Sequence, residues 1–276
     1  MLKISKETNL CISIAERPSN FGTTIFNAAF AAANLDFIYK ACRLDPSGNN
    51  LKDAIGGIKA LGIKGCGVSM PFKVEAIKYM DILDESALRV GAINTILNNN
   101  GTLKGFNTDY YGAREILGSI PNVADKRVFV LGSGGVALAI CAALRSLGVK
   151  ETTICNRTEK KANLIAQKWG YDTCAWTQRN EMGGEVLINA TSIGMSPQHL
   201  DMPVTRLCIN NFDMVVDVVI NPINTLLLQT GLDLGKTIIA GHEMTILQAA
   251  KQYEIYTNTP APLDIMTKNM QKLLNS

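Results

Sequence analysis

The stretch VFVLGSGGVALAI, residues 128–140, joins a short apolar run to a cluster of glycines and then to a segment rich in small apolar residues. Four consecutive apolar residues are typical of a buried strand in a parallel sheet, and the segment that follows has a helical composition. A strand that enters a helix through glycines is the arrangement in which such sheets bind a pyrophosphate at the helix N-terminus. This stretch therefore predicts a dinucleotide-binding βαβ unit.

The glycines of this loop have separate expected roles. Gly132 permits a tight turn, Gly134 lets the backbone approach a pyrophosphate, and Gly135 lets the helix pack closely on the sheet. The spacing is G-x-G-G-x-A instead of the usual G-x-G-x-x-G, so a tight turn without a ligand is the alternative interpretation. The predicted cofactor contacts in this loop are Gly132, Ser133, Gly134, Gly135, Val136 and Ala137.

The end of the next predicted strand decides between the two nicotinamide cofactors. NAD sites usually place an acidic residue there, roughly 20 residues after the glycines, to bind the ribose hydroxyls. This chain reads NRTEKKA from residue 156, with amide, guanidinium and hydroxyl groups in that place. These groups suit the 2′-phosphate of NADP, although a capped helix start with solvated charges is the structural alternative. The sequence therefore predicts NADP, bound by Asn156, Arg157, Thr158 and Lys161.

The rest of the chain alternates strand-like and helix-like segments, which predicts an α/β protein with parallel strands and crossover helices. In the first half, the predicted strands are residues 10–15, 37–44 and 65–70, and the predicted helices are residues 23–35, 50–62 and a segment from Pro71. The alternation restarts at Val128 with six candidate strands, and the turn-rich residues 98–109 suggest a domain boundary. The predicted domains are residues 1–106 with 241–276, and residues 107–240.

Composition excludes several classes of protein. The 276 residues carry a formal charge of +3 without a basic block, which argues against a nucleic-acid partner. Seven scattered cysteines are expected to be reduced thiols, and two isolated histidines form no metal-ligand pattern, so no metal site is expected. No apolar run approaches the roughly 18 residues of a membrane span, and the N-terminus lacks the apolar core of a signal peptide. A soluble, cytoplasmic protein is expected, either a monomer or a homodimer.

Two ionisable residues are candidates for proton transfer. Ser69 and Pro71 resemble a helix start, which would place Lys73 in a first turn, where the helix dipole disfavours a cation. A lysine there costs stability unless it serves a purpose, although a side chain that simply reaches water is the alternative. Asp109 lies near another predicted helix start, where an acidic residue is ordinary. Neither residue alone predicts a function.

Seven motifs, in order and along essentially the whole chain, resemble those of the shikimate dehydrogenase family. They are SMPFK (69–73), GAINT (91–95), NTDYYG (107–112), GSGGVALA (132–139), NRTEKKA (156–162), NATSIGM (189–195) and GHEMTILQAA (241–250). The resemblance implies a substrate domain completed by the C-terminal helices and a Rossmann-type NADP-binding domain, with the substrate in the cleft. It also implies an enzyme of aromatic amino acid biosynthesis that interconverts a ring hydroxyl and a ketone in a small cyclic carboxylic acid.

The same resemblance implies the site residues. Lys73 and Asp109 would be catalytic. The substrate contacts would be Ser19, Asn20, Thr23, Ser69, Asn94 and Gln248, and the further cofactor contacts would be Thr191, Ser192, Gly194, Met195, Val218, Gly241 and Met244. Each has an ordinary alternative: Asn94 as a turn residue, Gln248 as a surface residue and Met195 as core. Asp217, which interrupts an apolar strand, is either a satisfied structural group or part of the cleft floor.

The chain departs from the family pattern where the substrate carboxylate is bound. The family typically has an S-x-S-P sequence, and this chain has Asn20 and Gly22 at the serine positions, unless these residues form an ordinary helix entry. Ile220 stands for a usual tyrosine, and Gly67 for a usual asparagine. We therefore expect impaired use of shikimate, and expect Asn20→Ser with Gly22→Ser to lower its KM if the backbone at position 22 tolerates serine. A quinate-type dehydrogenase and an NADP-binding sensor with little catalysis are the alternatives.

Overall fold

The computed structural model describes residues 4–274, which form two compact units. The first unit runs to Tyr111 and resumes at Ile246, and the second comprises Gly112–Thr245. The two boundaries therefore fall inside two helices, α4 (Thr108–Gly118) and α9 (Gly241–Thr257). The predicted first domain, residues 1–106 with 241–276, includes residues 1–3 and 275–276. These five residues lie outside the described part of the chain.

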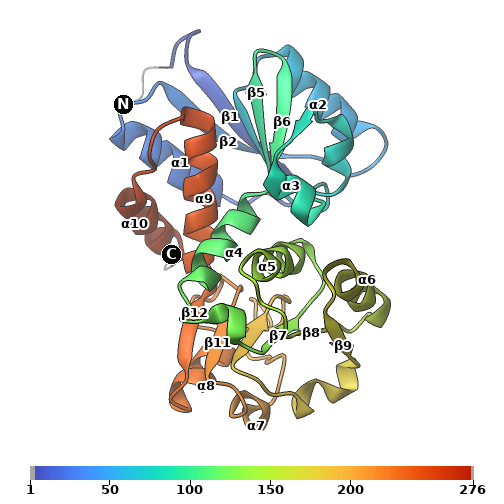
Figure 1. Ribbon diagram of the computed structural model, residues 1–276. Helices are drawn as coiled ribbons and strands as arrows, with labels where there is room; N and C mark the ends of the chain where they lie inside the picture. The colour runs from blue at the N-terminus through green and yellow to red at the C-terminus, as the bar shows by residue number, and fades with distance from the viewer. Residues whose placement is uncertain (1–3, 275–276) are drawn as a thin grey trace. The chain divides into compact units, whose positions relative to one another are not determined.

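The first unit contains a six-stranded mixed sheet in the order β2-β1-β3-β5-β6-β4. Its strands are β1 (Asn9–Ala15), β2 (Phe37–Arg43), β3 (Gly65–Val68), β4 (Ile82–Leu83), β5 (Thr95–Asn99) and β6 (Thr102–Phe106). The expectation of parallel strands is confirmed for β1 with its two neighbours, β2 and β3. Strands β5 and β6 were not predicted, because residues 98–109 were interpreted as a turn-rich boundary, and β5 is antiparallel to both β3 and β6. Asn100 and Gly101 both have positive φ, so they form a tight hairpin turn that reverses the chain there, as Figure 1 shows.

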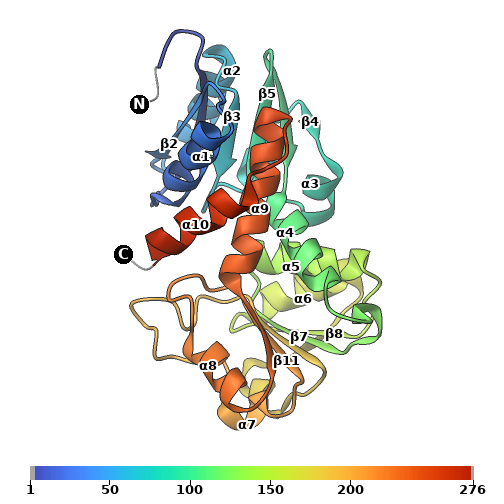
Figure 2. The same ribbon diagram turned by 90° about the vertical axis from the view of Figure 1, so that its left-hand side faces the viewer.

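Helices complete the first unit. They are α1 (Phe21–Ala32), α2 (Asn50–Ala60), the 3₁₀ helix η1 (Glu75–Tyr79), α3 (Glu85–Val90) and α10 (Leu263–Leu274), with parts of α4 and α9. The predicted helix from Pro71 is wrong, because residues 70–74 form turns in which Phe72 N donates to Ser69 O, and only η1 follows. Helix α10 packs against α1 (Figure 2), so the C-terminal segment completes the core of this unit.

The second unit contains six parallel strands in the order β12-β11-β10-β7-β8-β9. They are β7 (Val128–Leu131), β8 (Thr152–Cys155), β9 (Asp172–Cys174), β10 (Val186–Asn189), β11 (Met214–Asp217) and β12 (Thr237–Ala240). The six predicted strands of this half are therefore confirmed. Read from β9, the order is 3-2-1-4-5-6, which is that of the Rossmann fold. The predicted α/β class is confirmed as well.

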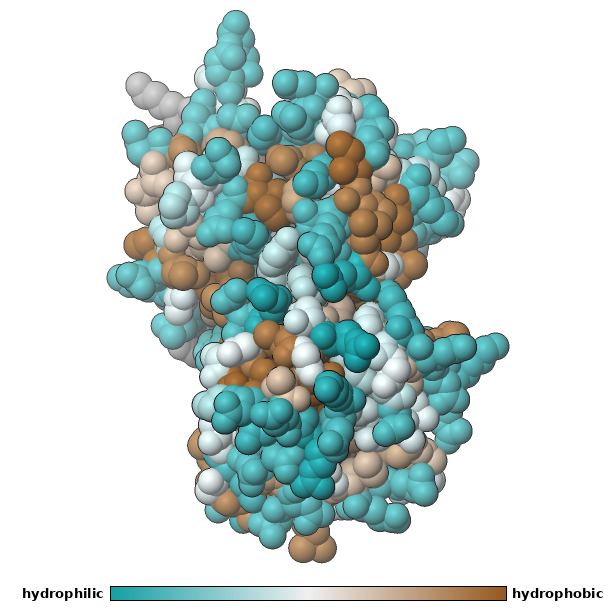
Figure 3. All heavy atoms as spheres, viewed as in Figure 1, coloured by the Kyte–Doolittle hydropathy of each residue, from teal (hydrophilic) through white to brown (hydrophobic). Residues whose placement is uncertain are grey.

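Helices cover both faces of this parallel sheet. They are α5 (Gly135–Ser146), α6 (Glu159–Trp169), α7 (Arg206–Ile209) and α8 (Leu226–Asp233), with the short 3₁₀ segments η2 (Val123–Asp125) and η3 (Trp176–Glu181). Figure 1 shows α5 and α6 on one side of the sheet and α7 and α8 on the other. Strands β7 and β10 are buried along their whole length, as a doubly covered sheet requires. Figure 3 shows polar residues over most of the visible face of each unit, with smaller apolar patches between them.

Candidate functional site

The first unit contains a pocket of about 210 Å³. Its lining comes from β1, α1, β2, β3 and the segments that follow them, together with α4 and α9. The lining residues are Ser13, Ala15, Arg17, Pro18, Ser19, Phe21, Gly22, Phe26, Tyr39, Gly67, Val68, Ser69, Lys73, Asn94, Asp109, Gln248 and Gln252. The carboxyl ends of the parallel strands β1 and β3 meet at this pocket, which is the edge where open α/β sheets bind their ligands.

Lys73 and Asp109 form an ion pair in this pocket. Lys73 Nζ lies 2.6 Å from Asp109 Oδ2, and the two side chains are 16% and 11% exposed. Asp109 comes from the first turn of α4, whereas Lys73 lies in the turns before η1. The predicted placement of Lys73 in the first turn of a helix is therefore wrong, and the partner carboxylate accounts for the lysine instead of the helix dipole. An ammonium group has three donors, so it can donate to Asp109 and to a ligand together.

A polar network orders Asn94 and Gln248 in the same pocket. Asn94 is buried, and its Oδ1 accepts hydrogen bonds from Thr108 N at 2.7 Å and from Thr95 Oγ1 at 2.9 Å. Gln248 Oε1 accepts from Thr108 Oγ1 at 3.1 Å, and Asn94 Nδ2 donates to the same oxygen at 3.5 Å. Neither Asn94 nor Gln248 is a free surface residue. The network leaves the donor group of the Gln248 amide available to a ligand.

The other predicted substrate residues do not all meet here. Ser19 and Ser69 line the pocket. Asn20 does not line it, since it is exposed at the N-cap position of α1, where its side chain makes no capping hydrogen bond. Thr23 Oγ1 accepts a hydrogen bond from Ala41 N at 3.2 Å, so it ties α1 to β2. The structure thus groups Ser19 and Ser69 with the ion pair and leaves Asn20 and Thr23 outside the lining.

Tyr39 is the pocket residue that the sequence reasoning missed. It is 4% exposed, and its ring stacks on Phe26 with centroids 4.6 Å apart. A Cβ at Gly22 would lie 2.7 Å from Tyr39 Cε1, and a Cβ at Gly67 would lie 2.8 Å from Tyr39 Oη. The obstacle to serine at position 22 is therefore a neighbouring ring and not the backbone angles, which corrects the expectation for Gly22→Ser. Two glycines where the family has larger side chains were the available signal.

Three further polar lining residues were also missed. Ser13 lies on β1 opposite Gly67 of β3, and a Cβ on Gly67 would lie 3.3 Å from Ser13 Cβ. Gln252 is buried, and its Nε2 donates to Thr95 Oγ1 at 2.8 Å and to Asn94 O at 3.3 Å. Arg17 is exposed in the segment between β1 and α1. No motif marked these residues, because their place in the pocket depends on tertiary contacts.

In the second unit, the glycine loop after β7 has the geometry of a phosphate site. Gly132 has φ +117°, and a Cβ there would lie 2.5 Å from Ala190 O, so only glycine fits. Gly134 is the N-cap of α5 and makes no side-chain capping bond, and a Cβ on it would meet no described atom within 4 Å. Ser133, Gly135, Val136 and Ala137 complete this turn into α5. Uncapped amides beside open space fit the pyrophosphate of a dinucleotide.

The segment after β8 carries the residues predicted to select the cofactor. Asn156 Nδ2 donates to Thr158 O at 3.0 Å, and Thr158 is the N-cap of α6 without a side-chain capping bond. Arg157 and Lys161 are exposed. The alternative interpretation, a helix start capped by the Asn156 or Thr158 side chain, is therefore wrong. The Arg157 guanidinium and the Thr158 hydroxyl have no intramolecular role in the described residues. Their chemistry fits a phosphate monoester.

The loop after β10 is held by a buried carboxylate. Asn189 Oδ1 accepts from Thr191 N and Thr191 Oγ1, and Asn189 Nδ2 donates to Asp217 Oδ1 at 2.9 Å. Asp217 also accepts from Val219 N at 3.1 Å and from Thr225 Oγ1 at 2.6 Å. Burial raises the pKa of Asp217 to about 6, against the lowering effect of these hydrogen bonds. Asp217 is thus a satisfied structural group that joins this loop to residues 219–225.

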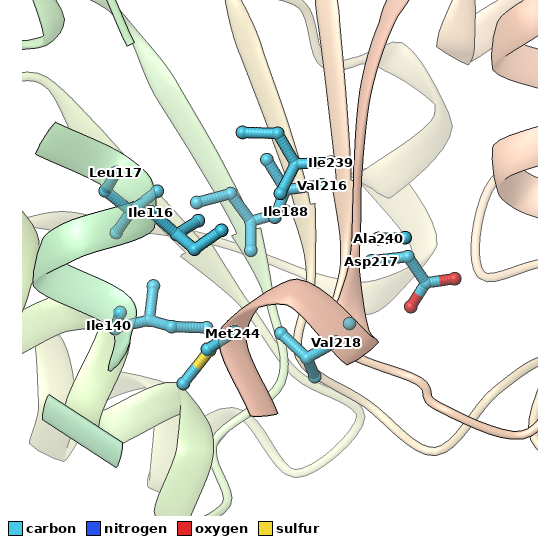
Figure 4. A pocket seen from close by; sticks show the side chains of 12 residues that line it. Ile116, Leu117, Ile140, Ile188, Val216, Asp217, Val218, Ile239, Ala240 and Met244 are labelled. Atoms are coloured by element: carbon cyan, nitrogen blue, oxygen red, sulfur yellow. The ribbon is translucent and has the colours of Figure 1, made fainter. Parts of the chain in front are cut away.

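The remaining predicted cofactor residues belong to the loops after β10 and β11 and to the start of α9. Ser192 and Met195 are exposed, and Gly194 has φ +91°. Val218, Gly241 and Met244 line an apolar cavity of about 10 Å³, which has room for no more than a single water molecule. Figure 4 shows Asp217 at its edge, with the carboxylate pointing away from the apolar side chains. This cavity is too small to hold a ligand.

Two expected absences concern the whole described chain. Among residues 4–274, no group of three His, Cys, Asp or Glu residues is arranged to hold a metal ion. Within the same range, no helix combines the length and apolar character needed to span a bilayer.

Each of the two units matches a model of the same protein family. The family model described as "Shikimate dehydrogenase substrate binding domain" matches residues 21–96, and the model described as "Shikimate / quinate 5-dehydrogenase" matches residues 113–198. The shikimate dehydrogenase-like protein of Haemophilus influenzae is 36% identical over 257 residues, which cover 92% of this chain and 93% of that protein.

Two solved structures are similar over nearly the whole chain. A shikimate dehydrogenase in complex with NADP+ has a TM-score of 0.89 and 31% identity, and the match covers 99% of this chain and 98% of that one. The ligand-free 5-ketofructose reductase of Gluconobacter sp. strain CHM43 has a TM-score of 0.87 and 31% identity, with 98% and 100% covered. The same architecture therefore occurs in proteins named for two different substrates, shikimate and 5-ketofructose.

Proposed function

The chain belongs to the shikimate dehydrogenase family, and from that membership we propose that it is an NADP-dependent oxidoreductase. It transfers a hydride reversibly between NADPH and a ring carbonyl of a shikimate-like cyclic hydroxy compound. The observation that carries this proposal is the Lys73–Asp109 ion pair, which lines the pocket of the first unit.

Lys73 and Asp109 are proposed to manage the proton of the reacting oxygen. During reduction, the carbonyl oxygen gains negative charge as the hydride reaches carbon, and the Lys73 ammonium donates a proton to it. Asp109 orients that ammonium, because it accepts from Nζ at 2.6 Å. In the reverse direction the neutral amine accepts the hydroxyl proton. Asn94, Gln248, Ser69 and Ser19 are proposed to bind the substrate hydroxyls, whereas the proposed contacts of Asn20 and Thr23 lack support from the pocket lining.

The second unit is proposed to hold the cofactor. The amides of Gly134 and Gly135 would bind the pyrophosphate, and Arg157 and Thr158 would bind the 2′-phosphate. The loop from Thr191 to Met195 would lie beside the nicotinamide, supported by its attachment to Asp217 through Asn189. NADPH, when bound, supplies the hydride.

Steady-state kinetics with a panel of substrates tests this proposal. The panel contains shikimate, quinate and, because a relative is named for it, 5-ketofructose, each with NADP(H) and NAD(H). We expect turnover of at least one compound, with NADP(H) preferred. The competing function, an NADP-binding sensor or interaction protein, would give tight NADPH binding without turnover of any member, and the retained ion pair argues against it.

We further propose a cytoplasmic protein, a monomer or homodimer, without a nucleic-acid partner. The seven cysteines are all free thiols, which suits a reducing compartment. Size-exclusion chromatography with light scattering would determine the oligomeric state.

A further inference from the structure

Tyr39 occupies the space in which the side chains of two neighbouring positions would lie. Its phenol extends from β2 over β1 to β3, where a Cβ on Gly67 would be 2.8 Å from Oη. The same ring would be 2.7 Å from a Cβ on Gly22 of α1. Any side chain at position 22 or 67 therefore competes with the phenol for space. At this end of the pocket, the Tyr39 side chain occupies the volume that two side chains would otherwise fill.

The structure holds Tyr39 in place from both its backbone and its ring. Asn27 Oδ1 accepts from Tyr39 N at 2.8 Å, and Asn27 Nδ2 donates to Tyr39 O at 2.9 Å. Phe26, the residue before Asn27, stacks on the ring at an interplanar angle of 14°. Two successive residues of α1, Phe26 and Asn27, thus fix Tyr39. The position of the phenol in the pocket is therefore set by the packing of α1 on β2.

Few donors remain for a ligand at this end. Ser13 and Tyr39 contribute one hydroxyl group each at this end, both next to Gly67. Gln252 uses its Nε2 on Thr95 Oγ1 and Asn94 O. Burial raises the pKa of Tyr39, which keeps the phenol neutral and protonated. A carboxylate taken out of water needs several donors or a cation, whereas a single hydroxyl is satisfied by one donor and one acceptor.

We propose that Tyr39 is a specificity-determining residue, and that the substrate presents an uncharged hydroxyl group, not a carboxylate, to the end of the pocket formed by Ser13, Tyr39 and Gly67. This inference rests on the proposed function. The substrate class is then a polyhydroxylated ketone or its alcohol. The Tyr39 phenol donates a hydrogen bond to the substrate hydroxyl or accepts one from it. The serine and asparagine that the family pattern has at positions 22 and 67 are then not needed to bind a carboxylate.

Arg17 is the lining residue that competes with this interpretation. Apart from Lys73, which is paired with Asp109, it is the cation of the described lining, and it is exposed. An acidic substrate could bind to Arg17 in place of the lost hydroxyl donors. Arg17→Ala separates the two cases, because it lowers activity on an acid held by Arg17 and leaves activity on an uncharged substrate within about threefold.

The test compares shikimate with its analogue in which a hydroxymethyl group replaces the carboxylate, in steady-state oxidation by the full chain with NADP+. We expect the wild type to have the higher kcat/KM for the hydroxymethyl compound. Tyr39→Phe should lower that value about tenfold, the effect of about one hydrogen bond, with at most a threefold change for shikimate. Tyr253→Phe is the matched control, since Tyr253 is buried in the same cluster but does not line the pocket.

The outcomes separate the two levels of the proposal. A higher kcat/KM for shikimate, with loss of that activity in Arg17→Ala, would overturn the inference while leaving the proposed function intact. An equal effect of Tyr39→Phe on both compounds would also overturn it. If the protein turned over neither compound and no other member of the substrate panel, both the proposed function and the inference would be contradicted.

Discussion

Lys73 Nζ donates to Asp109 Oδ2 at 2.6 Å, across 36 positions of sequence and with both side chains largely shielded from water. We expect Lys73→Ala and Asp109→Asn each to lower kcat by about 10²-fold or more. Because the two act as one unit, the double variant should be little worse than either single variant. NADPH affinity should not change, since neither residue belongs to the second unit. The measurements are steady-state turnover and fluorescence titration of NADPH.

The chain offers a matched control for this experiment. Lys59 and Asp81 form another lysine–aspartate pair in the first unit, at 3.0 Å, but their side chains are 47% and 41% exposed. Lys59→Ala should leave kcat within about twofold, because a solvated pair contributes little. Wild-type turnover in Lys73→Ala would remove the proton-transfer role of that residue.

Arg157→Ala should weaken NADPH binding about 10- to 100-fold, the value of a charge-assisted hydrogen bond of about 1.5–3 kcal/mol. NADH binding should change little, because NADH lacks the 2′-phosphate. Fluorescence titration of both cofactors measures the effect, with Arg206→Ala as an exposed arginine control in the same unit. Equal affinity of the wild type for NADPH and NADH would contradict the assignment of this segment.

Gly67→Ala should destabilise the protein by about 1–3 kcal/mol, because the new Cβ overlaps Tyr39 Oη. In a Tyr39→Phe background the oxygen is absent, and we expect the cost of Gly67→Ala to fall by about 1 kcal/mol or more. Urea unfolding of the four proteins measures this coupling. The control is Gly57→Ala in α2, where a Cβ meets nothing within 4 Å and should stabilise the helix slightly. Strict additivity would show that the two residues do not compete for space.

Asp217 should make the stability of the protein depend on pH. Its pKa is raised from 3.8 to about 6 in the folded state, so the folded protein binds the proton more tightly than the unfolded chain does. The stabilising contribution is therefore complete below about pH 4 and is lost as the pH rises through about 6, by about 2–3 kcal/mol. Asp217→Asn should remove this component. Urea unfolding of both proteins from pH 4 to 8 gives the difference, and parallel curves would disprove it.

The parts of the fold that local patterns encode could be predicted from the sequence. Strands β7 and β10 of the second unit are buried along their whole length, so each appears as an apolar run, and Gly132 marks the turn that only glycine permits. Strands β5 and β6 were missed, although Asn100 and Gly101 carry a hairpin signal, because the turn-rich composition of residues 98–109 suggested a domain boundary. The place of Lys73 in a run of turns was missed because Pro71 resembles a helix start.

The site was predicted in part for similar reasons. The resemblance implied that Lys73 acts beside Asp109, and the two side chains do meet, because α4 packs beside the turns before η1. Tyr39 was missed because it sits in an ordinary apolar strand, and only the absence of side chains at Gly22 and Gly67 gives it access to the pocket. Asn20 and Thr23 were assigned to the site by alignment alone, and the side-chain directions of α1 place them elsewhere.

The core of the first unit joins the two ends of the polypeptide, since Phe26, Phe30 and Tyr39 pack with Tyr253 and Met266. On the ribosome, the N-terminal residues emerge first but lack their partners until the last helices have been made. The second unit, which is continuous in sequence, can fold while the first is still incomplete. A nascent chain that stops near residue 245 would thus leave the aromatic face of α1 without the partners that α9 and α10 supply.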